Sequence, residues 1–396
     1  NRGYLEDIIP TIKKCTYLNT AGQGPKPRPT FEKINELYLL NMKNGGATKP
    51  VLMETNLQAE LARKKIASLL NADVEEIAFI RSVAEGVNMI TYGLALEAGD
   101  EIITTDQENM AVLLALLNLE KIKGVKIKRI ELYNDTEAIL DNLEKSLTPR
   151  TKLLVLSHVT YTKGLRLPAR EISEIAHRNG TMVMFDGAQS AGQFPIDLKN
   201  IDCDFYAAAG YKWLLGFHGT SVLYIKKQVL NQVTPLFIGD GSQSLVDFNT
   251  CEYELYNQAR KFEFGSRHLP LYAALGPSID FIEAFGINNI ENRILSLATR
   301  LKNGLSEIPG VAIHSPLNNK EICSGITTFT SKIIDPEKYI EWLWQEKNIL
   351  AKWIHLSDLG SNIKGVRVSV DFFNSEEEVD CFLKATKTYI EMREIN

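Results

Sequence analysis

The sequence T-M-V-M-F-D-G-A-Q-S-A-G at residues 181–192, with F-Y-A-A-A-G-Y-K-W-L-L-G at residues 205–216, decides the fold of this chain. In each stretch a short apolar run leads into small residues and a polar side chain, Asp186 in the first and Lys212 in the second. Such runs are typical of buried parallel strands, and α/β sheets place ligands at the carboxyl ends of these strands. We therefore expect the Asp186 carboxylate and the Lys212 amine to meet over one crevice.

An acid and an amine placed in this way suit pyridoxal 5'-phosphate (PLP). A lysine forms a Schiff base with this cofactor, and an acid keeps its ring nitrogen protonated so that the ring accepts electrons. Lys163, in another strand-end loop, is a rival for the Schiff-base residue, but the order of acid, turn and lysine favours Lys212. From the two residues alone, a turn-capping aspartate and an exposed lysine are the alternative interpretation.

Composition narrows the class of protein. A chain of 396 residues, 44% hydrophobic and 23% charged, is typical of a soluble globular protein with two or three domains. The net charge of −5 does not favour nucleic acid, and no apolar stretch approaches the roughly 20 residues that span a bilayer. Five scattered cysteines without a C-x-x-C pair indicate reduced thiols and a cytoplasmic protein. The six histidines show no metal-ligand spacing, so we expect no metal site.

Strand and helix patterns alternate along the chain, which predicts an α/β protein with a parallel or mixed sheet covered by helices. Arg81-Ser-Val-Ala-Glu-Gly-Val-Asn88 stands between a short strand, 77–80, and a helix, so that several backbone N–H groups point to one spot. This junction is a ready anion site, although an ordinary strand-to-helix turn has the same pattern. The polar region Thr234–Gln258 is expected to be a loop. From about Phe281, long helices and short strands predict a smaller α+β domain.

Six motifs in register resemble the class V aminotransferase family of PLP enzymes, which includes the cysteine desulfurases. They are Glu85 and Asn88 in the small-residue turn, Gly99-Asp-Glu-Ile-Ile103, Ser157-His-Val159, Asp186-Gly-Ala-Gln-Ser190, Lys212-Trp-Leu-Leu-Gly216 and Arg367-Val-Ser369. The resemblance covers nearly all of the chain. It implies PLP fold type I, the aspartate-aminotransferase-like fold, with a mixed, mostly parallel seven-stranded sheet. We expect an N-terminal segment at 1–25 joining the small domain and the active site, a large PLP-binding domain at 26–270, and a small α+β C-terminal domain at 271–396.

The resemblance assigns roles around the cofactor. Lys212 corresponds to the Schiff-base lysine and proton shuttle, and Asp186 to the partner of the pyridinium nitrogen. Gln189 would hydrogen-bond the phenolic oxygen of the ring, and Ala188 would pack beneath the ring. The turn Val83-Ala84 would hold the phosphate through backbone N–H groups.

Other roles concern the substrate and a second subunit. Arg367 corresponds to the residue that grips the substrate α-carboxylate, a task suited to a planar guanidinium group. Without the family, an arginine on a late strand would more often be a surface ion pair. Ala21, Gly22 and Tyr161 complete the expected substrate site. Ser266, in F-G-S-R, corresponds to the residue that reaches the phosphate of the neighbouring subunit, which implies a homodimer.

Several positions depart from the desulfurase pattern. Asn109 replaces the histidine that stacks on the cofactor, and Ala84 replaces a small hydroxyl residue beside the phosphate. Tyr211 stands where desulfurases have a histidine, and its phenol is the expected substitute. Tyr161 replaces a substrate-facing asparagine. His158 is either a pocket residue touching the cofactor or a hydrogen-bonded histidine at the end of a strand.

The largest departure is the loop before Arg367. Desulfurases place a nucleophilic cysteine there to accept sulfur as a persulfide, but residues 351–366 contain no cysteine. Without a thiolate in reach, persulfide transfer has no acceptor. Cys323, the nearest earlier cysteine, is expected to be buried packing.

The remaining motifs resemble the subgroup of cyst(e)ine C–S lyases and isopenicillin-epimerase-like enzymes. They are T-Y-L-N-T-A-G-Q-G at 16–24, S-H-V-T-Y-T-K-G-L-R-L-P at 157–168 and D-G-A-Q-S-A-G at 186–192. The resemblance implies an external aldimine and an α-carbanion, with β-elimination at a sulfur-bearing amino acid as the expected outcome. The alternatives are an aminotransferase or epimerase, a cysteine desulfurase, and a non-catalytic binding protein that keeps the fold. We expect no nucleic-acid or membrane partner.

Overall fold

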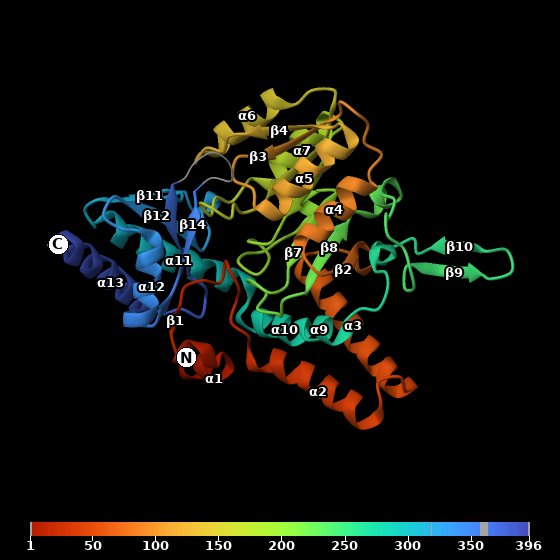
Figure 1. Ribbon diagram of the computed structural model, residues 1–396, viewed down its shortest axis with the longest axis horizontal. Helices are drawn as coiled ribbons and strands as arrows, with labels where there is room; N and C mark the ends of the chain where they lie inside the picture. The colour runs from red at the N-terminus through yellow and green to blue at the C-terminus, as the bar shows by residue number, and fades with distance from the viewer. Residues whose placement is uncertain (1, 318, 357–362, 395–396) are drawn as a thin grey trace.

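The computed structural model describes residues 2–317, 319–356 and 363–394. It confirms the expected α/β fold, with a seven-stranded sheet covered by helices and a smaller antiparallel sheet beside it (Figure 1). In the described residues no helix has the length and apolar character needed to cross a bilayer. The five cysteines all lie in these residues, and each is a free thiol.

The large sheet has the strand order β2-β8-β7-β6-β5-β3-β4. Only β8 runs antiparallel to its neighbours, and the pairs from β7 to β4 are all parallel. The strands are β2 (Ile77–Ile80), β3 (Glu101–Thr105), β4 (Lys126–Ile130), β5 (Thr151–Ser157), β6 (Met182–Asp186), β7 (Phe205–Ala209) and β8 (Ser221–Ile225). The central strands are buried and apolar on both faces, as expected for a sheet covered on both sides.

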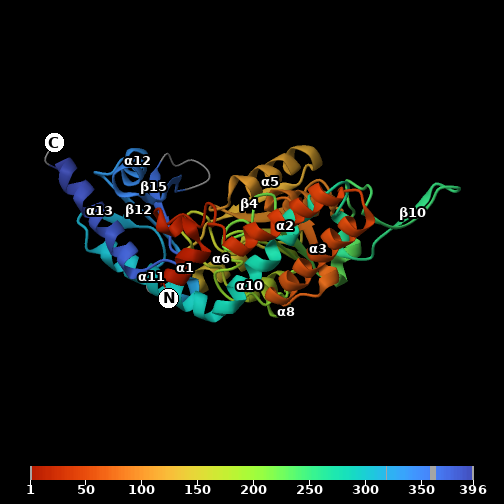
Figure 2. The ribbon, with the colours of Figure 1, turned by 90° about the horizontal axis from the view of Figure 1, so that it is seen from below.

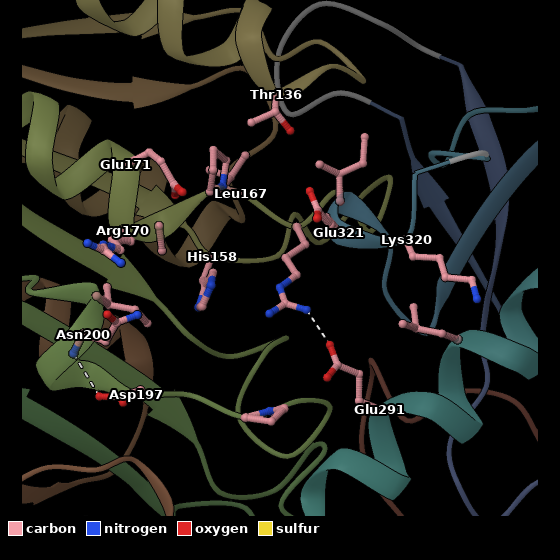
Figure 3. A pocket seen from close by; sticks show the side chains of 17 residues that line it. Thr136, His158, Leu167, Arg170, Glu171, Asp197, Asn200, Glu291, Lys320 and Glu321 are labelled. Atoms are coloured by element: carbon pink, nitrogen blue, oxygen red, sulfur yellow. Dashed lines mark hydrogen bonds and ion pairs between the residues drawn. The ribbon is translucent and has the colours of Figure 1, made fainter.

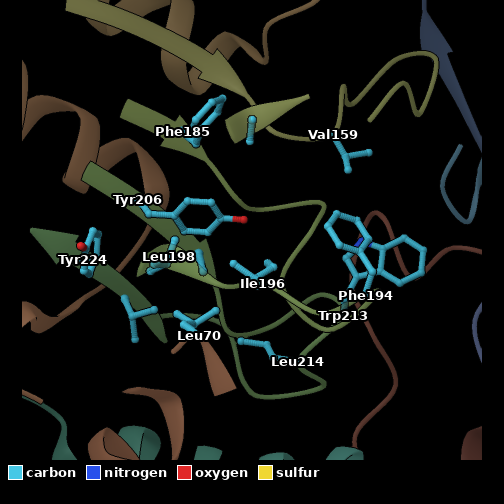
Figure 4. Close-up of a cluster of buried hydrophobic side chains, with 14 of the residues drawn as sticks. Leu70, Val159, Phe185, Phe194, Ile196, Leu198, Tyr206, Trp213, Leu214 and Tyr224 are labelled. Atoms are coloured by element: carbon cyan, nitrogen blue, oxygen red, sulfur yellow. The ribbon is translucent and has the colours of Figure 1, made fainter. Parts of the chain in front are cut away.

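Alternate residues of the central strands enter two hydrophobic cores. Phe185 of β6 and Tyr206 of β7 pack on one face with Trp213, in the cluster that Figure 4 shows. Met184 and Ala207 pack on the other face. The helices around the large sheet are α2 (Arg28–Asn44), α3 (Lys49–Leu69), α4 (Val83–Gly93), α5 (Met110–Lys123), α6 (Thr136–Ser146), α7 (Ala169–Arg178), α8 (Leu198–Ile201), α9 (Leu269–Ala273) and α10 (Leu275–Phe285).

The small sheet is antiparallel, in the order β11-β12-β15-β14. Its elements are α11 (Ile287–Ser306), β11 (Val311–Ile313), β12 (Ile326–Ser331), α12 (Pro336–Lys347), β13 (Ile349–Leu350), β14 (Lys352–His355), β15 (Lys364–Ser369) and α13 (Glu376–Glu394). Short 3-10 turns occur at Pro10–Lys13, Val74–Glu76, Lys227–Gln232, Ala259–Phe262 and Lys320–Ile322. The α9 and α10 helices, predicted within the small domain, pack against α2 and α3. The domain boundaries themselves stay a prediction.

The N-terminal segment joins the small sheet to the large one. Its α1 helix (Arg2–Ile8) lies beside α13, where Arg2 and Glu378 form a 2.7 Å ion pair. Its β1 strand (Thr16–Tyr17) pairs in parallel with β13. The chain then crosses toward the carboxyl ends of β6 and β7, so the segment is held at both ends.

One expectation from the sequence is wrong. The region Thr234–Gln258 is not a loop throughout, because β9 (Gln243–Asp247) and β10 (Glu252–Leu255) form an antiparallel hairpin. The hairpin extends away from the rest of the chain (Figure 2), and its apolar side chains are exposed, Phe248 at 88%. Because these strands face no core, their pattern lacks the sustained alternation that identifies a half-buried strand.

A buried ion pair secures the outer edge of the large sheet at β2. Arg63 of α3 pairs with Glu263, and both side chains are at most 8% exposed. Arg63 also donates to the Ile77 carbonyl at 2.8 Å, and Glu263 accepts from the Phe79 N–H at 2.7 Å. The pair therefore satisfies backbone groups of an edge strand that no other strand covers.

We predict that Glu263→Ala lowers the free energy of unfolding by about 3 kcal/mol, because the buried Arg63 loses its buried partner and keeps only Glu60, which is 38% exposed. Chemical denaturation at neutral pH measures the loss. Glu144→Ala is the matched control, since it removes a fully surface ion pair with Arg178 and should cost only about 0–1 kcal/mol. Equal losses in the two variants would contradict a structural role for the buried pair.

Candidate active site

A pocket lies at the carboxyl ends of the central strands of the large sheet. Asp186, the last residue of β6, and Lys212, in the turn after β7, both line it, so the structure brings the acid and the amine together. The other predicted site residues that line it are Val83, Ala84, Asn109, Tyr161, Ala188, Gln189 and Tyr211.

Asp186 is a buried carboxylate with part of its hydrogen-bonding capacity unused. One oxygen accepts from the Ala188 N–H at 2.7 Å, and within the described chain the other accepts no hydrogen bond. Burial raises the pKa of Asp186, while the Lys212 ammonium and the Ala188 N–H act against this shift. The free oxygen suits a protonated nitrogen donor placed over it.

The amine of Lys212 donates no hydrogen bond to any described residue. Burial, with smaller contributions from the Arg367 and Lys352 charges, lowers its pKa to about 8. The Asp186 carboxylate opposes these effects. A substantial fraction of the amine is therefore neutral, and so nucleophilic, near neutral pH.

The N-terminal segment packs closely against the turn that carries Lys212. The Gly24 N–H donates to the Tyr211 carbonyl at 3.0 Å. A Cβ atom on Gly24 would lie 2.1 Å from the Lys212 carbonyl oxygen, so this approach requires glycine. The amine is thus presented from a turn whose backbone is fixed from a distant part of the sequence.

Arg367 is a buried cation without an acidic partner in the described residues. It is 1% exposed, and it donates to the Tyr161 carbonyl at 3.2 Å, while its Nε has no hydrogen-bond partner. Burial lowers its pKa to about 10. Lys352 lies opposite Arg367 across the β14–β15 pair and likewise has no ion pair. An uncompensated buried charge is costly, so this position favours an anionic ligand.

Gln189 connects the pocket to the N-terminal segment. Its amide nitrogen donates to the Ala21 carbonyl at 3.0 Å, and its oxygen accepts from the Trp213 indole at 2.9 Å. The Ala21 N–H in turn donates to the Ser369 hydroxyl at 3.0 Å. Gly22 follows at the same bend, where a Cβ would approach the Asn19 side chain to 2.8 Å. Ala21 and Gly22 thus lie beside the pocket, although neither lines it.

The predicted phosphate turn is the first turn of α4, which begins at Val83. The Ser82 hydroxyl caps this helix by accepting from the Glu85 N–H at 3.2 Å. The N–H groups of Val83 and Ala84 have no intrahelical partner and are available to an anion. The Tyr211 ring, 4.1 Å from the His218 ring, borders the same space.

Asn109 lines the pocket, but its side chain caps a helix. Its side-chain oxygen accepts from the Ala111 N–H at 2.9 Å and caps α5. Ser266 lies outside the pocket, on an exposed loop that lines a separate cavity with Arg81 and His268. Within its own chain, Ser266 therefore does not reach the site.

The structure places the His158 ring outside this pocket. The ring lines a second cavity between the loop after β5 and α11, where Arg166 and Glu291 form an ion pair (Figure 3). Its Nδ1 lies 3.0 Å from the Tyr206 hydroxyl, and burial lowers its pKa to about 3. This neutral, hydrogen-bonded histidine fits the second of the two expectations. Only its backbone N–H contacts the site, donating to the Asp186 carbonyl at 2.9 Å.

The family called aminotransferase class-V matches residues 16–382, which is nearly the whole chain. The chain belongs to this family. The identification agrees with the order of elements around the pocket, in which the acid ends one strand and the lysine follows the next.

Individual proteins similar to this class-V chain carry two kinds of name. A probable cysteine desulfurase of Pyrococcus abyssi (strain GE5 / Orsay) is 30% identical over 389 residues, which cover 96% of each chain. The apo structure of a cysteine desulfurase from Thermococcus onnurineus NA1 is 28% identical, with a TM-score of 0.90 over 98% of each chain. The cystine C–S lyase C-DES, in complex with its reaction product cysteine persulfide, is 24% identical, with a TM-score of 0.87 over 97% of this chain and 99% of that one. At this identity, the likeness to C-DES shows only a shared fold.

Class-V membership makes the chain a PLP-dependent enzyme similar to cysteine desulfurases and C–S lyases, with an amino-acid substrate. The residues present fit the cofactor. The pocket offers the free oxygen of Asp186 for a ring nitrogen, the unbonded amine of Lys212 for an aldehyde, and a helix start for a phosphate. Ala188 lines the pocket with a side chain small enough to leave room for a flat ring.

The class-V site also contains a residue that the sequence reasoning missed, Glu108. This carboxyl group is fully buried and accepts from the Ser157 N–H and hydroxyl at 3.0 and 2.6 Å and from the Thr105 hydroxyl at 2.8 Å. It fixes Ser157, which lines the pocket next to Asp186. The signal was available, because Glu108 follows β3 at the same sheet edge.

We predict that Glu108→Gln makes stability less dependent on pH. Burial raises the pKa of Glu108 from its usual 4.5 to about 7. A carboxyl group whose pKa is raised by folding contributes stability below its unfolded pKa, and this contribution is lost as the pH rises through the folded pKa. Relative to the parent, the variant should therefore gain about 1–3 kcal/mol in free energy of unfolding between about pH 4.5 and about pH 7.

Urea denaturation across this pH range measures the difference between the two proteins. Glu144→Gln, on an exposed part of α6, reports the effect of losing a surface carboxyl group alone. A constant difference between Glu108→Gln and the parent at all pH values would contradict the assignment.

Proposed function

We propose that this class-V enzyme is a PLP-dependent C–S lyase that acts on a sulfur-bearing amino acid by β-elimination. The observations that carry the proposal are a pocket lined by the acid and the amine, a buried Arg367 that donates to the carbonyl of the pocket residue Tyr161, and a stretch before Arg367, 351–366, whose sequence has no cysteine. Part of that loop, 357–362, lies outside the described residues, but its sequence, S-D-L-G-S-N, contains no thiol.

Each residue of the site has a separate role in the proposed reaction. Bound PLP supplies an electron sink for the negative charge left when an α-proton is removed. Lys212 would hold the cofactor through its amine, and the same amine would be the base that takes the α-proton of the substrate. Asp186 keeps the ring nitrogen protonated, because its burial beside Lys212 leaves one oxygen free to accept a charged N–H donor. The start of α4 holds the phosphate through its backbone N–H groups.

Arg367 orients the substrate. Its guanidinium group is held by the Tyr161 carbonyl and lies 5.1 Å from the Tyr161 ring, so its planar fork has a fixed direction. A carboxylate bound there accepts charge-assisted hydrogen bonds, including one from the orphaned Nε.

The absence of a cysteine from the loop 351–366 determines what happens to the β-sulfur of the substrate. A desulfurase passes sulfur to a cysteine of its own, and the named relatives favour this second candidate function. Cys323 is the nearest cysteine before the loop, but it is 6% exposed and is held by the Pro316 carbonyl. Without an acceptor thiol in reach, the sulfur leaves with the departing group, and elimination is the supported outcome.

A homodimer is part of the proposal. Ser266 is exposed and does not reach the pocket of its own chain, and Arg267 next to it is held by the Phe79 and Phe262 carbonyls. The loop is therefore anchored while its serine faces outward. This geometry supports a serine that completes the phosphate site of a neighbouring copy.

We predict that the protein purified with PLP is yellow and that Lys212→Ala loses the absorbance of the covalently held cofactor. Lys163→Ala is the matched control, because Lys163 does not line the pocket, and it should keep the colour. A parent protein that stays colourless with added PLP would favour a binding protein without catalysis.

The reaction is identified by supplying cysteine, cystine, alanine and α-keto acids in turn. We expect pyruvate and a sulfur product from cystine or cysteine, in equal amounts, and no amino-group transfer to an α-keto acid. Persulfide on one of the five cysteines after turnover would overturn the lyase in favour of a desulfurase.

We predict that Arg367→Lys raises KM for the amino acid by about 10–100-fold, because an ammonium group replaces a bidentate fork with a single point charge. Steady-state kinetics with the best substrate of the screen measure KM and kcat separately. The absorbance of bound cofactor serves as the control and should not change. An unchanged KM would remove Arg367 from carboxylate binding.

A further inference from the structure

A lysine and a cysteine meet in the interior of the small domain, away from the active site. The amine of Lys302, on α11, donates to the Cys323 sulfur at 3.4 Å, and both residues are nearly fully buried, at 3% and 6% exposed. Both also donate to the same acceptor, the Pro316 carbonyl, at 2.7 and 3.3 Å. Two nucleophilic side chains are thus fixed against each other by one backbone oxygen.

The pair has no acidic neighbour to explain it. Lys302 forms no ion pair within the described residues, so its burial is not compensated by a carboxylate. Burial lowers its pKa, with Cys323 acting in the opposite direction, so the amine is neutral more readily than an exposed lysine. The neutral amine is the form in which the lysine nitrogen is nucleophilic, and it lies in contact with the sulfur that would be oxidised.

Small molecules can approach this region from two sides. Pro316 and Ile322 line a surface cavity next to β11, and Ile322 with Lys320 also lines the larger cavity of Figure 3. The segment that ends in Cys323 therefore lies between two cavities, each large enough for dioxygen.

We propose that Lys302 and Cys323 form a redox modification site, in which dioxygen links the lysine nitrogen to the cysteine sulfur through a single oxygen atom. One N–H bond and the S–H bond break, and one N–O and one S–O bond form. The lysine nitrogen and the cysteine sulfur each lose two electrons, and dioxygen takes up all four. One oxygen atom enters the bridge, and the other leaves as water together with the two hydrogens.

The bridge connects α11, a helix of the small domain, to the segment around Cys323 through which the small domain contacts the large domain. On either side of Cys323, the Ile322 carbonyl accepts from the Arg166 N–H at 2.9 Å and the Ser324 hydroxyl donates to the Gly164 carbonyl at 2.7 Å. The Gly325 N–H donates to the side chain of Gln193 at 2.8 Å. Oxidation therefore ties α11 to the segment that joins the two domains, and reduction releases it.

Mass spectrometry of the whole protein tests the proposal. After exposure to air, the parent should gain about 14 Da, one oxygen minus two hydrogens, and dithiothreitol should reverse the gain. Digestion should give a joined peptide containing residues 302 and 323. The oxidised protein should also melt at a higher temperature than the reduced one, because a cross-link restricts the unfolded chain.

Three variants separate the bridge from other oxidation. Cys323→Ser and Lys302→Arg should each lose the mass gain and the shift in melting temperature. Cys203→Ser should keep both, because Cys203 is equally buried but makes no hydrogen bond to a lysine. A gain of about 16 Da on Cys323 without a joined peptide would overturn the proposal in favour of a simple sulfenic acid. A parent mass that does not change in air would overturn it as well.

Discussion

The active site depends on buried charged groups that have fewer hydrogen-bond partners than their polar atoms can bind. Among the residues that the structure describes, one Asp186 oxygen has no donor, the Lys212 amine has no acceptor, and the Arg367 Nε has no partner. Each of these deficits costs free energy in the protein alone. A cofactor that brings a protonated nitrogen and an aldehyde, together with a substrate that brings a carboxylate, satisfies all three groups. The architecture around the pocket can be understood as the means of keeping these groups buried and apart.

Distant parts of the chain are needed to do this. The sheet supplies Asp186 and Lys212 from successive strands, and the small sheet supplies Arg367 on β15. The N-terminal segment joins both, through Ala21 to Gln189 on one side and to Ser369 on the other. Because one hydrogen-bonded bend contacts both sheets, a relative movement of the sheets would change the distance between the arginine and the lysine.

The sequence was sufficient for the parts of the structure that obey local rules. Buried parallel strands are short apolar runs with turn residues at their ends, so the positions of Asp186 and Lys212 at one edge of the sheet followed from pattern alone. Glu108 follows β3 at the edge of the site, but it was missed because the donors that distinguish it from an ordinary loop carboxyl group are seen only in the structure. The direction of the His158 ring is also a tertiary property, since it depends on Tyr206 of another strand. The β9–β10 hairpin, 243–255, was missed because β9 does not alternate polar and apolar residues, and only the four residues of β10 do.

The ion pair at β2 has a consequence for the behaviour of the protein at high concentration. An open sheet has two edges, and an unprotected edge can recruit strands from other molecules. At one edge Arg63 and Glu263 occupy backbone groups of β2 from within, so those groups are not offered to a neighbour. At the other edge, β4 carries Lys126, Lys128 and Arg129, charged side chains of the kind that disfavour edge-to-edge pairing, and Lys128 is paired with Glu101. The chain is thereby protected against fibrous self-association at both borders of its main sheet.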